Sequence, residues 1–176
     1  MKGNFDPCLK ELLIHEGGFS NHKDDPGGVT NLGVTKRVYE EWVGHPVSVD
    51  IMRRLNTDSV KALYKTRYWN ALQCDALPIG LDLCVFDFGV NAGVKRSARY
   101  LQRLVGATAD GVIGPKTLSL VQQLVKSDGP SAAIVKFQDM RRDYYKQLPT
   151  FKTFGKGWLR RVDEIEKAAR AMAKGL

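Results

Sequence analysis

Residues 79–90 constrain the fold of this chain most strongly, because they are apolar on nearly every side. The stretch reads IGLDLCVFDFGV and is interrupted only by two Gly and two Asp residues. A helix that is hydrophobic all round is usually buried at the centre of a protein. We therefore predict a helix over residues 79–90 with other helices packed around it.

The remaining chain indicates a mainly helical protein, since apolar residues recur at helical spacing through most of it. Helices are expected over residues 7–16, 36–42, 57–69, 94–105, 115–125, 131–148 and 157–172. No run alternates apolar and polar residues over the length of a strand, so strands are expected only within residues 19–35. The length of 176 residues suits one domain that can divide into two lobes.

The segment 16–35, EGGFSNHKDDPGGVTNLGVT, joins the first helix to a compact loop or hairpin. Asp6 is the predicted N-cap of that helix, with Pro7 at its first position. Gly17 and Gly18 are expected to end it in the left-handed conformation. The DPGG sequence that follows is typical of a tight reversal.

Glu16 stands at the next step of an apolar stripe on the first helix. The stripe is formed by Phe5, Leu9, Leu12 and Leu13. A carboxyl group in that register is expected in an apolar environment, which disfavours the ionised form and suits a general acid.

Glu16 and Asp25 together could cleave a glycosidic bond. That reaction needs a protonated carboxyl group beside the leaving oxygen and a second group to manage water or the developing positive charge. Their spacing alone is weak support, because acidic residues near turns are common.

The motif EGGF followed by DPGGVTNLGVT closely resembles the signature of family 108 glycoside hydrolases, roughly EGGY…DPGG-x-T-x-x-G-I-T. These enzymes are N-acetylmuramidases that cut the β-1,4 bond between N-acetylmuramic acid and N-acetylglucosamine in peptidoglycan. The family includes phage endolysins and bacterial muramidases linked to protein export. The resemblance implies a lysozyme-like, mainly α fold in which a small loop or β-hairpin carries part of the active site.

The resemblance also implies roles for individual residues. Glu16 becomes the catalytic acid, and Asp25 falls at the spacing of the second carboxylate in phage-type lysozymes. Thr30 matches the Thr of the family motif and is assigned to hold water. Phage-type lysozymes have their hydroxyl residue one position later, where this chain has Asn31. Asn31 is assigned to substrate binding. Phe19 replaces the more usual Tyr.

FDFGVNAG, residues 86–93, resembles the segment that lines the cleft in lysozyme-like folds. Asp87 and Asn91 lie four apart on one helical face, so from spacing alone they either line a cleft or brace a neighbouring helix. The resemblance favours substrate binding. Tyr68 and Trp69 form an aromatic pair that is either core or a platform for a sugar, and both are assigned to substrate binding.

Two lobes are expected to pack as one compact unit. Residues 1–92 are predicted to form the catalytic muramidase lobe. Residues 93–176, which include DGVIGPKTL, resemble the peptidoglycan-binding part that accompanies it.

Positive charge is concentrated near the C-terminus. The net charge is +8, and residues 126–176 hold 12 Lys or Arg against 6 Asp or Glu. Such a surface attracts nucleic acid, anionic lipid or the anionic bacterial wall, or it is simply a solvated basic face. With the resemblance we expect peptidoglycan and not nucleic acid as the partner, with Lys152, Lys156, Arg160 and Arg161 adding affinity for the wall.

Cysteine and histidine spacing predicts no metal site and no cofactor. Cys8, Cys74 and Cys84 are an odd number without CxxC spacing. His15-Glu16 begins like HExxH, but Phe19 stands where the second His is needed.

No apolar run approaches the roughly 20 residues that cross a bilayer, and MKGNFDPCLKELL lacks the apolar region of a signal peptide. We expect synthesis in the cytoplasm without a signal peptide and no stable membrane insertion. The protein is expected to be a monomer that reaches the cell wall in the periplasm through a holin or an export route.

The sequence therefore predicts a peptidoglycan hydrolase, with a phage endolysin as the leading hypothesis. The alternatives are a bacterial muramidase that assists export, a lytic transglycosylase, and a wall-binding module without catalysis. Asp25 and Thr30 favour the use of water, and we expect inversion at the anomeric carbon.

Overall fold

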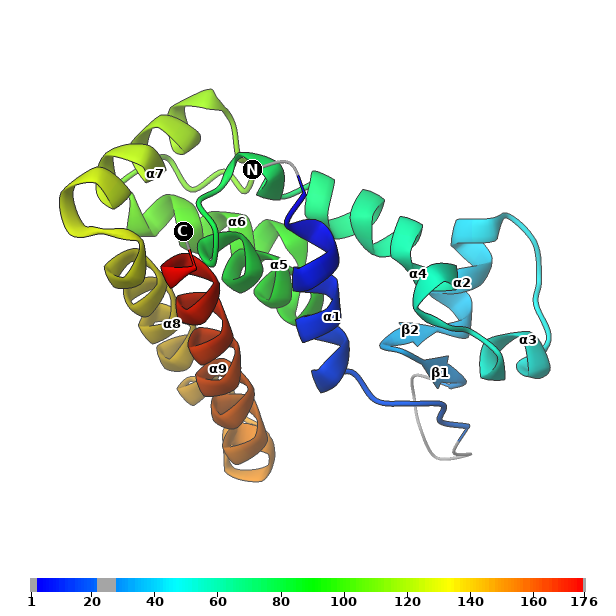
Figure 1. Ribbon diagram of the computed structural model, residues 1–176. Coiled ribbons are helices and arrows are strands. Elements are labelled where there is room, and N and C mark those ends of the chain that lie inside the picture. Colours follow the sequence, from blue (N-terminus) through cyan, green and yellow to red (C-terminus); the bar gives the residue numbers. More distant parts are fainter. Residues whose placement is uncertain (1–2, 22–27, 176) are drawn as a thin grey trace.

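The computed structural model describes residues 3–21 and 28–175 (Figure 1). The helices are α1 (Phe5–His15), α2 (Lys36–Val43), α3 (Val49–Arg53), α4 (Thr57–Tyr64), α5 (Leu81–Ala92), α6 (Val94–Leu104), α7 (Pro115–Asp128), α8 (Pro130–Lys146) and α9 (Phe151–Lys174). A π-helical segment, Lys65–Asn70, continues α4, and a 3-10 turn, Cys74–Ala76, precedes α5. The mainly α fold class is confirmed.

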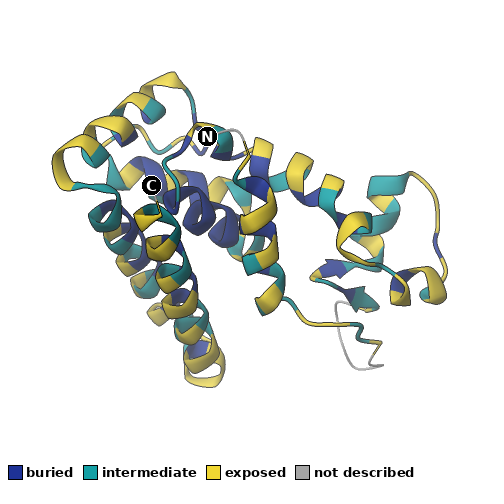
Figure 2. Cartoon of the chain, in the orientation of Figure 1, coloured by how far each residue is buried: buried dark blue, intermediate teal, exposed yellow. Residues whose placement is uncertain are grey.

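Helix α5 forms the centre of the fold, as its apolar sequence predicts. Every residue from Leu81 to Gly89 is buried, and the helix contacts α1, α6, α8 and α9. Figure 2 shows this dark, buried helix between more exposed ones. It ends at Ala92, two residues beyond the predicted end, so Asn91 belongs to its last turn.

The other helices lie on the two sides of this centre. Helices α6 to α9 gather on one side, with α8 and α9 packed along each other. The hairpin, α2 and α3 lie at the opposite end in Figure 1, and α1 and α4 lie between the two groups. The end of α1 therefore points into the space between the hairpin and α9, where the functional site is built.

The short antiparallel hairpin consists of β1 (Thr30–Asn31) and β2 (Val34–Thr35). Leu32 and Gly33 connect the strands and have φ of 49° and 73°. Positive φ at both central residues is what a two-residue hairpin turn of this hand requires. In the described part of the chain, strand pairing is confined to the predicted region, including the bridge between Ser20 and Thr30.

Helix α1 differs from the prediction at both ends. It begins at Phe5, so Pro7 is not its first residue, and Asp6 bonds to Lys61 instead of acting as the cap. At the other end, neither Gly17 nor Gly18 has positive φ. The helix stops because Glu16 turns to an extended conformation, with φ −85° and ψ 137°.

Helix α9 begins at Phe151, six residues before the predicted start, and passes through two glycines. Glycine is a poor helix former, which is why the sequence suggested a later start. A side chain at Gly155 would meet the ring of Phe151 at 2.4 Å, so packing of this ring requires a glycine there.

The three cysteines are buried and free. Among the described residues, no helix is both long and apolar enough to cross a membrane.

Candidate active site

Glu16 lies where α1, the hairpin and α4 meet. Its side chain is 16% exposed. A methyl group added at Gly33 would lie 2.6 Å from Oε2 of Glu16 and 2.6 Å from the hydroxyl of Tyr64, so only glycine allows the hairpin to come this close. Tyr64 donates a hydrogen bond of 2.8 Å to the carbonyl of Leu32, which fixes the turn beside the carboxylate.

A cation from the distant α9 completes the surroundings of Glu16. Nη2 of Arg161 donates to Oε1 of Glu16 at 2.6 Å. The expected apolar environment is therefore wrong, because a charged guanidinium group contacts the carboxyl group directly. The physical reason lies in the backbone: α1 ends at His15, so Glu16 leaves the helical register that the stripe of apolar residues defines.

Arg161 is held in turn by Asp87 of α5. Its Nη2 lies 2.7 Å from Oδ1 of Asp87, and its Nε lies 3.1 Å from the same oxygen. Asp87 is fully buried and also pairs with Nη2 of Arg141 at 2.6 Å. Burial alone would raise the pKa of Asp87, but the two guanidinium groups outweigh it and lower the pKa.

The same network extends to the end of α5. Arg141 is buried, and its Nε and Nη2 each lie 3.2 Å from the hydroxyl of Tyr145. That hydroxyl donates to Oδ1 of Asn91. Glu16, Arg161, Asp87, Arg141, Tyr145 and Asn91 thus form one chain of polar contacts, which we call the Glu16 network.

The two residues predicted from FDFGVNAG differ in their access to solvent. Asn91 is exposed and can meet a ligand. Asp87 is 0% exposed, so the expectation that it touches substrate is corrected: its oxygens are occupied by arginines that brace the site.

The hairpin residues have different surroundings. The hydroxyl of Thr30 donates to the carbonyl of Gly28 at 3.3 Å, and the residue is partly exposed. Asn31 is only 5% exposed, and its amide donates to the carbonyl of Met52 at 2.8 Å. Its assignment to substrate binding is corrected, because this amide ties the hairpin to α3. Asp25 lies outside the described residues.

Of the aromatic pair, only one member reaches the surface. Trp69 is fully buried, with its ring centre 5.3 Å from those of Phe5 and Phe86, so it is core and not a sugar platform. Tyr68 is partly exposed and packs 5.7 Å from the ring of Tyr64. Burial raises the pKa of both tyrosines, and the charge of Glu16 raises it further, so both hydroxyls stay protonated.

A cavity of about 400 Å³ opens between the end of α1 and α9. Its walls include His15, Asn91, Trp158, Arg161 and Glu164. It joins an exposed amide, an aromatic ring and the guanidinium that holds Glu16. Such a mixture of one aromatic surface and a few polar groups is what a small polar ligand such as a sugar needs.

Three contributors to the site were missed by sequence reasoning. Arg161 was grouped with the basic surface, and neither Tyr64 nor Gly33 was singled out. Arg161 is 145 positions from Glu16 along the chain, and no local pattern signals that contact. Residues 3–21 and 28–175 contain no group of three or more side chains suited to holding a metal ion.

Comparison with known proteins identifies the family. Residues 9–93 match the family described as Glycosyl hydrolase 108, and residues 96–163 match a Predicted Peptidoglycan domain. The solved structure of Brucella abortus SagA is 36% identical, covers 98% of this chain and 97% of its own, and superposes with a TM-score of 0.85. The chain belongs to the glycosyl hydrolase 108 family. No curated protein matches it.

Membership in family 108 confirms the lysozyme-like, mainly α fold. Together the two family matches support a glycosidase that acts on peptidoglycan at the cell wall. Glu16, Gly33 and Tyr64 lie within the hydrolase match, whereas Arg161 lies within the peptidoglycan-domain match. The C-terminal stretch of this family 108 protein therefore supplies a direct contact to the carboxylate of the N-terminal one.

Proposed function

We propose that this family 108 protein is an N-acetylmuramidase that hydrolyses the β-1,4 bond between N-acetylmuramic acid and N-acetylglucosamine. The observation that carries the proposal is the position of Glu16. Its carboxylate is partly exposed and lies against Gly33 of the hairpin. It bonds to Arg161 of α9, which lines the cavity between α1 and α9.

Glu16 acts as the general acid that protonates the leaving oxygen. Arg161 bonds to Oε1 of Glu16, which orients the carboxyl group and leaves Oε2 to carry the proton to the substrate. Asp87 keeps Arg161 in place because it contacts two nitrogens of the same guanidinium. Arg161 is thus a positioning residue.

Asp25 and Thr30 are proposed to hold the attacking water on the opposite face of the sugar. This arrangement is a single displacement, for which the two carboxyl groups stand about 6.5–9.5 Å apart. The product should first appear as the α-anomer. Proton NMR recorded before mutarotation tests this step, and an initial β-anomer would instead make Asp25 a nucleophile.

The biological setting proposed is lysis by a phage endolysin that reaches the wall through a holin. A bacterial muramidase that assists export shares all the residues discussed, and gene neighbourhood distinguishes the two. In both settings residues 93–176 bind the wall while residues 1–92 cleave it.

Release of reducing sugar from purified peptidoglycan tests the activity. Glu16→Gln keeps nearly the same shape but cannot deliver a proton, so the rate should fall by at least about 100-fold. Glu11→Gln makes the same chemical change on α1 away from the site and should retain activity. Wild-type rates for Glu16→Gln would reject the assignment.

Mass spectrometry of the products separates the remaining alternatives. Hydrolysis adds water, whereas a lytic transglycosylase uses a hydroxyl of its own substrate and leaves a product one water lighter. A wall-binding module without catalysis would release no product at all while still sedimenting with the wall.

A further inference from the structure

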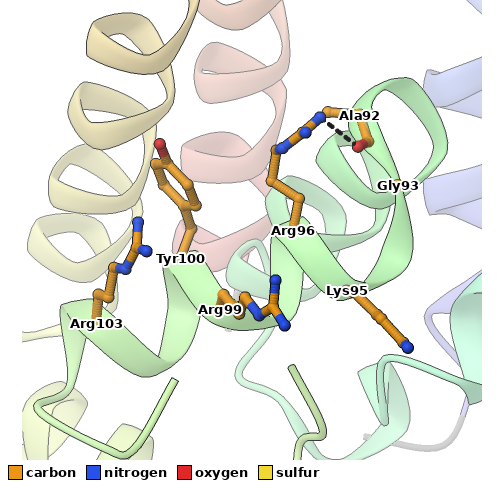
Figure 3. A pocket seen from close by; sticks show the side chains of 7 residues that line it. All are labelled: Ala92, Gly93, Lys95, Arg96, Arg99, Tyr100 and Arg103. Atoms are coloured by element: carbon orange, nitrogen blue, oxygen red, sulfur yellow. Dashed lines mark hydrogen bonds between the residues drawn. The ribbon is translucent and has the colours of Figure 1, made fainter. Parts of the chain in front are cut away.

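Helix α6 carries a cationic groove of about 390 Å³ that lies outside the catalytic site. Figure 3 shows Lys95, Arg96, Arg99 and Arg103 spread along α6, with Tyr100 near Arg103 and Gly93 at the other end. We call this the α6 groove. No acidic residue of the described chain lines it, and its volume falls within the range of about 300–1,000 Å³ common for ligand pockets.

The charges of the α6 groove are not neutralised by the described part of the protein. All four cations are exposed, and none forms an ion pair within residues 3–21 and 28–175. Asp110 experiences the charge of Arg99, but its carboxylate already accepts bonds from the amides of Gln102 and Val112.

Aromatic rings and backbone hold two of the guanidinium groups in place. Arg96 donates to the carbonyl of Ala92 at 2.9 Å and lies 4.9 Å from the ring centre of Tyr144. Arg103 lies 5.3 Å from the ring centre of Tyr100. These contacts orient the groups but leave donors free, and a planar guanidinium binds a carboxylate through two parallel hydrogen bonds.

The spacing of the cations along α6 matches an extended acidic peptide. Lys95, Arg99 and Arg103 are four residues apart, which corresponds to about 6 Å per step along a helix. Alternate residues of an extended chain are separated by about 6.6 Å. Successive side chains of such a peptide that face α6 would therefore each meet one cation.

We propose that the α6 groove binds the stem peptides of peptidoglycan through their carboxylates. The inference rests on the proposed function, because the stem peptide is attached to N-acetylmuramic acid and so emerges beside the bond that is cleaved. The chain geometry agrees: Asn91 lines the cavity next to Arg161, and Gly93, two residues later, lines the α6 groove.

Sedimentation with purified bacterial walls tests the proposal. The variant R96Q/R99Q/R103Q removes three charges from the α6 groove. The matched control K116Q/K126Q/K174Q removes three exposed charges elsewhere. Both are made in the Glu16→Gln background and measured in the cold, so that the wall stays intact. The groove variant should bind about tenfold more weakly, and the control should change less than about twofold.

Two further arms identify the ligand. Walls from which an amidase has removed the stem peptides should bind the groove variant and its parent equally. Vesicles of phosphatidylglycerol should bind the groove variant and the matched control equally, because both have lost three exposed charges. A groove variant that binds intact walls as tightly as its parent overturns the proposal. A difference from the control that persists on stripped walls, or that appears on the vesicles, also overturns it and indicates another anion as the ligand, either the lactyl carboxylate that the amidase leaves on the glycan or phosphate.

The readout separates this inference from the muramidase assignment. Binding does not require catalysis, whereas reducing-sugar release by the wild-type chain does. If the groove variant and its parent bind walls equally while the wild-type chain releases reducing sugar, only the stem-peptide site is rejected. If the groove variant binds more weakly but the wild-type chain releases no reducing sugar, only the hydrolase assignment is rejected.

Discussion

Two groups of arginines in this family 108 protein differ in burial and in what neutralises them. Arg141 and Arg161 sit in the Glu16 network, where carboxylates lie 2.6–2.7 Å from their nitrogens. Arg99 and Arg103 lie exposed on α6 and have no carboxylate partner among the described residues. Both groups carry the same charge, but within the described residues only the first has its charge matched by carboxylates.

This difference in pairing suits the two groups to different tasks, one to fixing the position of a side chain and the other to binding an outside anion. An ionised group that is buried must be paired, and the pairing fixes its position. Arg161 can therefore hold Glu16 in one place. A solvated cation keeps its charge available to an outside anion, but each such interaction is weak because water and salt screen it. The paired arginines fix the geometry around Glu16, and the exposed ones on α6 are those proposed to meet the wall.

The largest expected effect is loss of stability in the buried group. Arg141→Met removes one cation from Asp87, which is fully buried, and should lower the free energy of unfolding by about 3–5 kcal/mol. Urea unfolding followed by circular dichroism measures it. The matched change Arg99→Met on α6 should stay within about 0.5 kcal/mol. Equal losses in both variants would contradict the comparison.

The second prediction concerns Arg161 as a positioning residue. Arg161→Gln should lower kcat by about 10- to 100-fold with a smaller change in KM, because Glu16 loses the contact that orients it. Arg161→Lys should recover part of the rate, since one of the charged contacts can be remade. Recovery by lysine distinguishes positioning from a purely structural role.

Its neighbour Arg160 supplies the control. Arg160 is exposed and lies 4.0 Å from Glu164, a loose pair on the surface of the same helix. Arg160→Gln should change kcat by less than about twofold, as expected for an exposed pair. A loss in Arg160→Gln as large as that in Arg161→Gln would show that charge on α9, and not the contact with Glu16, sets the rate.

Much of the fold was predictable because it depends on local pattern. The apolar run at residues 79–90 indicated the central helix, and the turn chemistry of residues 19–35 placed the hairpin. Helix ends were less predictable. Asp6 has the chemistry of a cap, yet it bonds to Lys61, a residue 55 positions away. Gly155 looked like a helix breaker because the packing of Phe151 above it could not be foreseen.

The proposed catalytic site was predictable only for residues within its motif. Glu16 was found because its neighbours in sequence carry the signature. The Glu16 network was not, because it joins α1, α5, α8 and α9 across long separations in sequence. Asn31 and Trp69 show the converse: a polar or aromatic residue near the motif can serve the core, and only its burial reveals this.

The third prediction uses acidity to sharpen the comparison. The pKa of Asp87 is lowered in the folded protein, since the two arginines outweigh burial. Its contribution to stability is therefore complete above the unfolded value of about 3.9 and is lost as the pH falls through the folded pKa, with a limiting slope of about 1.4 kcal/mol per unit. The free energy of unfolding should fall below about pH 4 in the wild type and more gently in Asp87→Asn. An exposed control, Asp58→Asn, should change the free energy of unfolding near pH 7 by less than about 0.5 kcal/mol.

The pKa of Asp82, on the same helix, is shifted in the opposite direction. Burial raises its pKa, and the hydrogen bonds from Asn4, Leu83 and Gly80 only partly offset this. Its protonated form is favoured by folding, so its contribution is present below the unfolded value of about 3.9 and is lost as the pH rises through the folded pKa. Asp82 thus partly offsets the loss of stability in acid that Asp87 causes. If the free energy of unfolding had the same pH slope in the wild type and in Asp87→Asn, the pairing of Asp87 with the buried arginines would not be the cause of that loss.

The smallest expected effect is that of salt on the two groups of arginines. Exposed charges are screened over about 8 Å at physiological ionic strength, whereas buried pairs are screened much less. Raising the salt from 0.05 to 0.5 M should weaken wall binding by the wild-type chain several-fold, because the α6 groove meets its ligand in water. The free energy of unfolding near pH 7 should change by less than about 1 kcal/mol over the same range, because the contacts of Arg141 with Asp87 are closed to solvent. Single removal of Arg99 should reduce the salt dependence of binding slightly and leave that of unfolding untouched. Wall affinity that does not change with salt, or a free energy of unfolding that changes strongly with salt, would contradict the division between paired and unpaired arginines.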